Sequence, residues 1–176
     1  MNPNAPESSR TLQRARRIAG EAVLAALIVA SGRLKIIPNV EWVSVLCLAA
    51  GMLLGPWAGI RVAVIGELLY SLTSPYGLAP PLVFLSQVAG MAPAGLAGGL
   101  MGRRHHPFWA FGASGLFTTL WFDLCTNLAS APFVGGIKPA LLMAIPLSAV
   151  HVASNVLFFS VVGPALGARL WPRPSA

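Results

Sequence analysis

Charged side chains are scarce in this sequence. Asp, Glu, Lys and Arg together make up 10% of its 176 residues, whereas soluble domains carry about 25%. So few charges could not cover the surface of a soluble protein with well-hydrated groups. The composition therefore excludes a soluble globular domain.

Cysteine is nearly absent as well. Cys47 and Cys125 are the two cysteines of the chain, and both lie inside apolar runs without CxxC or Cys/His spacing. This excludes a disulfide framework and a zinc site, and it favours a role for both as small packed side chains. We expect neither a bound metal nor a cofactor.

What the chain has instead is apolar length. Hydrophobic residues make up 56% of it, and the mean hydropathy is +0.72. Runs of such residues between Gly, Pro and charged breakers predict helices at residues 18–31, 42–54, 57–73, 82–101, 108–131 and 140–166. The sequence thus predicts an all-α integral membrane protein, one membrane domain over residues 1–176 built as a compact bundle of six transmembrane helices.

The basic residues predict the orientation of this bundle. Of the 12 basic residues, three fall on one side of the membrane, namely Arg33, Lys35 and Lys138. The other nine fall on the side of both termini: Arg10, Arg14, Arg16, Arg17, Arg61, Arg103, Arg104, Arg169 and Arg173. The positive-inside rule then places both termini in the cytoplasm. Residues 1–17 form a basic cytoplasmic segment, 18–169 the bundle and 170–176 a cytoplasmic tail.

A cleaved signal peptide is an alternative for the N-terminus, since arginines precede the apolar stretch "IAGEAVLAALIVASG". Glu21 inside that stretch is unusual for a signal core, and cleavage would leave five spans. We therefore expect the first segment to be a membrane helix.

The stretch "FDLCTN" places a carboxylate among apolar residues. Asp123 and Asn127 are four residues apart and share one helical face, in the outer half of the fifth segment. Gln87 lies in the outer third of the fourth segment, His151 near the middle of the sixth, and Asn155 one turn deeper. Ionisable groups at this depth are costly and usually functional. These five side chains predict a buried site for a small polar molecule.

The same residues allow other interpretations. The polar groups could simply join helices through hydrogen bonds. Glu67, in the middle of the third segment, could be a structural partner, or it could form an ion or proton relay with Asp123 and His151. "GASG" matches the pattern around the nucleophile of intramembrane serine proteases, with Ser114 as nucleophile and His151 as base, although the two differ in predicted depth. A channel or small carrier and a protease remain alternative functions.

Three loops flank the predicted outer mouth: "GRLKIIPNVEW", "SPYGLAPPL" and "APFVGGIKPA". They are too apolar and too rich in proline for ordinary solvated turns, and we interpret them as lids. Trp42 and Tyr76 offer stacking surfaces to a ligand, or they anchor the chain at the membrane interface.

Small residues form a stripe on the first segment. Ala22, Ala26 and Ala30 repeat every four residues, which lets another helix approach closely. The stripe could pack on another helix of this chain, or it could dock on a different membrane protein.

Together these features resemble the substrate-binding S components of energy-coupling factor (ECF) transporters, which are bacterial vitamin importers. The resemblance covers nearly the whole chain. It rests on six short helices, the alanine spacing, the stretch "GMLLGPWAGIRVAVIGELLYSLTSPYGLAPPLVF" and "WFDLCTN". No signature of a particular vitamin is present, and the cysteines do not mark the metal-ligating cysteine of some cobalamin-binding members.

The resemblance implies a vitamin-binding subunit in the bacterial cytoplasmic membrane that is not itself an enzyme. It implies docking through the first helix on a transmembrane coupling protein, which two cytoplasmic ATPases drive. It also implies a ligand between helices four to six, under loops one, three and five. In this sequence those positions are Gln87, Asp123, Asn127, His151, Trp42 and Tyr76.

Overall fold

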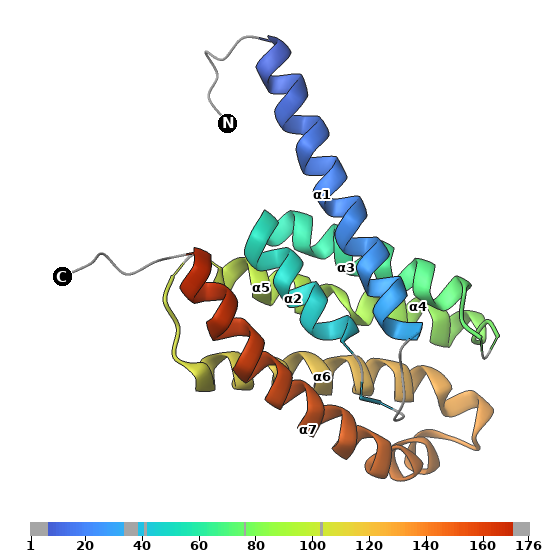
Figure 1. Cartoon of the computed structure of the whole chain (residues 1–176). Coiled ribbons are helices and arrows are strands. Elements are labelled where there is room, and N and C mark those ends of the chain that lie inside the picture. The colour runs from blue at the N-terminus through green and yellow to red at the C-terminus, as the bar shows by residue number, and fades with distance from the viewer. Residues whose placement is uncertain (1–6, 34–38, 41, 76, 103, 171–176) are drawn as a thin grey trace.

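The computed structural model describes residues 7–33, 39–40, 42–75, 77–102 and 104–170. In that part of the chain there are seven α-helices, one short 3-10 helix and no strand. The helices are α1 (Glu7–Arg33), α2 (Val43–Leu54), α3 (Pro56–Leu72), α4 (Pro81–Gly90), α5 (Ala92–Met101), α6 (Phe108–Ser130), η1 (Ala131–Phe133) and α7 (Ile137–Leu170). A single residue separates α4 from α5, so the two form one interrupted rod (Figure 1).

The structure confirms a helix at each predicted segment. The breakers end the helices as expected: Gly55 has φ 91° between α2 and α3, and Pro56 starts α3. By length and composition, Pro81–Met101 and Ile137–Leu170 could each cross a membrane within the described residues, and Val43–Leu54 is a shorter apolar helix. Of the residues used to predict orientation, Lys35, Arg103 and Arg173 lie outside the described residues.

Helix α1 is longer than its apolar segment. It begins at Glu7 and not near residue 18, and its N-terminal half projects beyond the other helices (Figure 1). The residues before Ile18 are polar but mostly good helix formers. The apolar run therefore predicts the part of α1 that packs on the bundle. It does not predict the helical extension before Ile18. Glu21 joins α1 to α3 through Arg61, with Arg61 Nε donating to Glu21 Oε2 at 3.0 Å.

Glycines bring α2, α3 and α5 into backbone contact. A Cβ on Gly98 would lie 1.9 Å from the carbonyl oxygen of Leu48, and one on Gly95 would lie 2.1 Å from that of Gly59. Such distances leave no room for any side chain. Helices α2 and α3 can therefore approach α5 this closely only because these positions are glycine, which has a hydrogen atom in place of a side chain.

Gly98→Ala is expected to destabilise the fold by about 2 kcal/mol, because overpacking against rigid backbone cannot relax by a side-chain rotation. Gly20→Ala is the matched control, since its Cβ would meet only Leu54 Cδ2 at 3.7 Å. That control should be neutral or stabilising, because alanine favours a helix by up to about 1 kcal/mol over glycine. Thermal melting in detergent measures both. Equal melting temperatures for the two variants would show that α2 and α5 can move apart at Gly98 at little cost in stability.

The rod of α4 and α5 is interrupted at Met91. Pro93 lacks an N–H, so the carbonyl of Ala89 loses its helical hydrogen bond at this point. Met91 is 2% exposed, and the hydroxyl of Ser44 lies 3.9 Å from its sulfur. On one side of the interruption α4 packs against α6, and on the other α5 packs against α2 and α3.

Helices α6 and α7 form the other half of the fold. They run antiparallel and side by side, joined through η1 (Figure 1). Gly115 lets α6 approach Asn155 and Phe159 of α7, and Phe111 and Phe159 are buried in the core cluster that α2 shares. This pairing places the second half of α6, with Asp123 and Asn127, beside the first half of α7, with His151.

Candidate functional site

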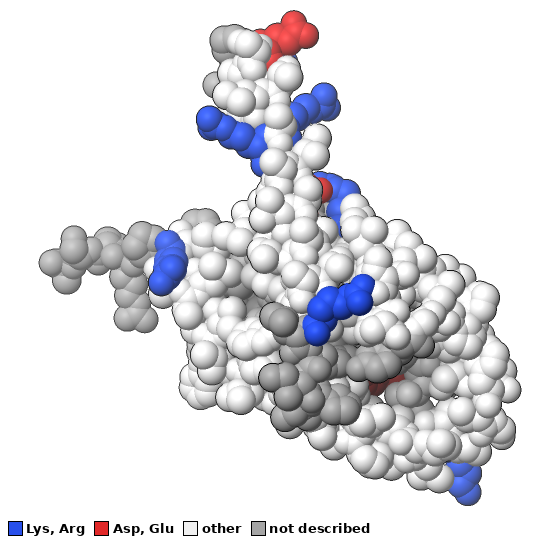
Figure 2. All heavy atoms as spheres, turned by 45° about the vertical axis from the view of Figure 1, so that its right-hand side comes forward, with Lys and Arg blue, Asp and Glu red and all other residues white. Residues whose placement is uncertain are grey.

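A cavity of about 540 Å³ opens between α3, α4, α6 and α7. Its volume lies within the range of about 300–1,000 Å³ that is typical of small-molecule sites. The lining residues are Asn39, Glu67, Tyr70, Ser71, Ser74, Gly77, Leu78, Ala79, Pro80, Gln87, Phe122, Asp123, Thr126, Asn127, Ala144, Leu147, Ser148 and His151. Figure 2 shows acidic side chains recessed in a hollow of an otherwise nearly uncharged body. The site is thus a polar cavity in an apolar molecule.

Asp123 and His151 form the centre of the cavity wall. His151 Nδ1 lies 2.7 Å from Asp123 Oδ1, and the residues are 3% and 8% exposed, respectively. An ionised Asp123 can only accept, and the Nδ1–H tautomer of His151 is the one that donates to it. Asp123 Oδ2 and His151 Nε2 are buried without a partner in the described residues. Because unpaired buried polar atoms are costly, these two atoms make the cavity the candidate binding site.

Glu67 extends the site to α3. It is 3% exposed, lines the cavity and accepts a hydrogen bond from the hydroxyl of Ser71 at 3.1 Å. The sequence placed Glu67 at mid-helix without deciding its role. The structure brings it to the same cavity as Asp123 and His151, so a second carboxylate faces the ligand space.

Two amides and two aromatic rings complete the wall. Gln87 and Asn127 line the cavity as the sequence predicted. Phe122 and Tyr70 line it too, and the ring of Phe122 meets that of His151 edge to face at 5.8 Å. Sequence reasoning missed both rings, because an aromatic residue in an apolar segment carries no sign of which way it faces.

Asn39 ties the connection between α1 and α2 to α7. Its side-chain Nδ2 donates to the carbonyl of Leu147 at 3.1 Å, and its own carbonyl accepts from the hydroxyl of Ser154 at 3.1 Å. The backbone is in the left-handed region, with φ 61°, which asparagine tolerates better than most residues. Asn39 also lines the cavity, so this part of the first predicted lid covers the site.

Two predicted site residues lie elsewhere, and a third is not described by the structure. Asn155 is fully buried below the cavity, where its Nδ2 donates to the hydroxyl of Thr119 at 2.9 Å. Trp42 does not line the cavity and stacks on Phe158, with ring centroids 4.4 Å apart. Tyr76 lies outside the described residues. The sequence predicts that Trp42 stacks on a ligand, whereas in the structure Trp42 stacks on a ring of α7.

The protease geometry is not assembled. Ser114 precedes Asp123, the partner of His151, by nine residues on α6, a rise of about 13 Å at 1.5 Å per residue. The turn around Ser114 faces residues 155–160 of α7 instead. Within the described residues no group of three or more His, Cys, Asp or Glu is placed to hold a metal ion.

The alanine stripe of α1 is exposed. Ala22, Ala26 and Ala30 face outward, whereas Ala25 and Ile28 are buried against the bundle. The interpretation that the stripe packs on another helix of this chain is therefore wrong for the described structure. The buried face of α1 is the neighbouring one, where Ile28 meets Gly66 of α3.

The chain is similar to a known family of transporter subunits. The family model described as "ECF-type riboflavin transporter, S component" matches residues 13–170, nearly the whole chain. Neither the curated proteins nor the solved structures contain a significant match. The matched region includes all of the cavity and the packed part of α1.

Proposed function

Because this chain belongs to the family of ECF-type riboflavin transporter S components, we propose that it binds riboflavin in the cavity of Asp123 and His151. It captures the vitamin outside the cell and delivers it through an ATP-driven coupling module. The single observation that carries the proposal is the buried pair of Asp123 and His151, each with a polar atom left for a ligand.

The chemistry of the cavity suits a flavin. Riboflavin combines a planar ring, whose pyrimidine edge carries carbonyl and N–H groups, with a flexible polyhydroxylated chain. Carboxylates and amides bind hydroxyl groups and N–H edges well, and Glu67, Asp123, Gln87 and Asn127 supply them here. Phe122 adds a flat apolar surface for the ring. A bare ion would have no use for the flat apolar surface.

Purified protein is expected to bind riboflavin with one molecule per chain and to quench its fluorescence, because the ring leaves water and meets aromatic side chains. The flavin ring without its polyhydroxylated chain should bind more weakly, since the carboxylates and amides then lack their partners. Thiamine and biotin serve as controls. Binding of thiamine but not riboflavin would keep the S-component function and change the ligand. Binding of no small molecule would contradict both.

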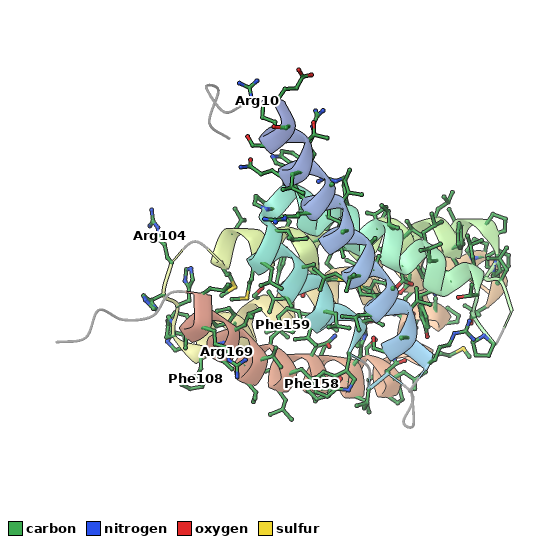
Figure 3. All side chains as sticks on the ribbon, turned by 45° about the horizontal axis from the view of Figure 1, so that its top comes forward. Arg10, Arg104, Phe108, Phe158, Phe159 and Arg169 are labelled. Atoms are coloured by element: carbon green, nitrogen blue, oxygen red, sulfur yellow. The ribbon has the colours of Figure 1, made fainter. Side chains whose placement is uncertain are left out.

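The proposed orientation follows the distribution of charge. Figure 3 shows Arg104, after α5, and Arg169, in the last turn of α7, at one end of the molecule, and Lys138 begins α7 at the other. Arg10 lies on the projecting N-terminal part of α1. We place the end of the molecule with Arg104 and Arg169, together with both termini, on the cytoplasmic side of a bacterial inner membrane, which six helical rods cross. The cavity, near the other end, then opens outward.

The proposed partner surface is the exposed alanine stripe of α1. Ala22, Ala26 and Ala30 leave a flat strip on which a helix can approach closely, and no helix of the described chain covers it. We assign it to the transmembrane coupling protein, which carries two ATPases. The ligand site and the docking surface thus lie on different helices.

A further inference from the structure

A second cavity lies at the opposite end from the proposed riboflavin site. It measures about 320 Å³ and lies between the α5–α6 connection and the last turns of α7. Arg104, His105 and His106 line it together with Phe111. We call it the basic pocket. Neither the binding of a vitamin nor docking through α1 uses these residues.

Among the described residues, the basic pocket has positive charge without an acidic partner. No acidic residue lines it, and the described acidic groups of the bundle are engaged elsewhere: Glu21 with Arg61, Glu67 with Ser71 and Asp123 with His151. Arg104 has no acidic partner among the described residues. Such a pocket attracts an anion.

His106 supplies a buried group for that anion. Its Nε2 atom is buried and has no partner in the described part of the chain, while its ring meets Phe111 edge to face at 6.2 Å. The contact with Phe111 holds the ring in place. A buried imidazole nitrogen without a partner indicates a missing ligand, as at the first cavity.

The surroundings identify the anion as a lipid headgroup. The basic pocket lies where α5 and α7 end and α6 begins. In the orientation proposed above, this end of the helices lies at the level of the lipid headgroups. Phe108 and Trp109, next along the chain, are 66% and 64% exposed, as expected of aromatic residues at a membrane interface. Figure 3 shows Phe108 at the same end as Arg104 and Arg169. A free phosphate would make no use of the exposed rings of Phe108 and Trp109.

We propose that the basic pocket binds the phosphate headgroup of an anionic phospholipid, with Arg104 and His106 as its ligands and the rim of Phe108 and Trp109 beside the acyl chains. Basic pockets at helix ends bind such headgroups in other membrane proteins. The proposal requires a membrane protein and does not depend on which vitamin is bound.

The test uses the full chain in lipid nanodiscs, with phosphatidylglycerol in a phosphatidylcholine background, and counts retained lipid by native mass spectrometry. Phosphatidylglycerol should be retained in preference to phosphatidylcholine. Arg104→Gln should weaken that preference about fivefold, since one basic side chain near the surface contributes about 1 kcal/mol. His106→Gln should weaken it as well. Lys138→Gln, at the other end of α7, is the matched control and should leave it unchanged.

Each outcome decides the proposal. Riboflavin binding and melting temperature report whether the variants fold, and both should match the parent, because these residues lie outside the first cavity. Equal retention of both lipids, or an unchanged preference in Arg104→Gln, overturns the proposal. Inorganic phosphate is titrated in parallel: if it binds at the pocket while phosphatidylglycerol does not, the pocket serves a free anion and the lipid assignment is wrong.

Discussion

Asp123→Ala is expected to weaken riboflavin binding by about 10- to 100-fold, as measured by titration of flavin fluorescence. Hydrogen bonds to a charged group contribute about 1.5–3 kcal/mol, and each 1.4 kcal/mol is about a tenfold change in affinity. The substitution removes the ligand contact of Oδ2 and also frees His151, whose orientation depends on the 2.7 Å contact with Oδ1. Asp123→Asn, which keeps the shape and loses the charge, should fall between the parent and the alanine variant.

Thr119→Val separates binding from helix packing. Thr119 is buried on the same helix and accepts from Asn155, but it does not line the cavity. Its replacement leaves a buried amide unpaired and should lower stability by about 1–3 kcal/mol with little change in riboflavin affinity. If Asp123→Ala behaves in the same way, lowering the melting temperature but not the affinity, the pair of Asp123 and His151 only joins α6 to α7.

Ala26→Trp is expected to abolish riboflavin uptake by cells and to prevent co-purification of the coupling protein and its ATPases. A large side chain on the exposed stripe holds two helix axes apart and removes many dispersion contacts at once. Riboflavin affinity of the isolated chain should stay unchanged, because α1 contributes no described helical residue to the cavity wall.

Two substitutions on the same helix complete that experiment. Leu27 is 48% exposed beside the stripe and already large, so Leu27→Trp should preserve uptake. Ala25 is buried, so Ala25→Trp should lower the melting temperature whether or not a partner is present. If Ala26→Trp keeps the partner bound, the docking role of the stripe is contradicted. Transport by the purified chain in liposomes without ATPases would contradict the subunit proposal itself.

Helix positions could be predicted because glycine, proline and charge interrupt the apolar runs. Gly55 and Pro56 separate α2 from α3, and Pro107 precedes α6. The start of α1 could not be predicted in this way. The polar residues before Ile18 continue the helix without packing on other helices. Hydropathy detects only the apolar stretch that packs, so it does not show where the helix begins.

Part of the candidate site could be predicted from spacing and depth. Asp123 and Asn127 share a face four residues apart, and an ionisable group at membrane depth has to avoid lipid. The rest depended on helix rotation. In a membrane protein the lipid-facing and core-facing sides are both apolar, so nothing in the sequence turned Phe122 inward or Trp42 toward Phe158.

Because the helix is interrupted at Met91, the number of residues in α4 determines which way the side chains of α4 face. Successive residues on a helix are rotated by about 100° around its axis. Inserting or deleting one residue between Gln87 and Met91 would therefore turn Gln87 out of the cavity, although α5 and its glycines would keep their places. A change of the same size before Pro80, in the connection from α3, would keep the faces of α4 and α5, although residues of that connection also line the cavity. A change of length in α4 is thus expected to disturb the position of Gln87 more than one in the connection.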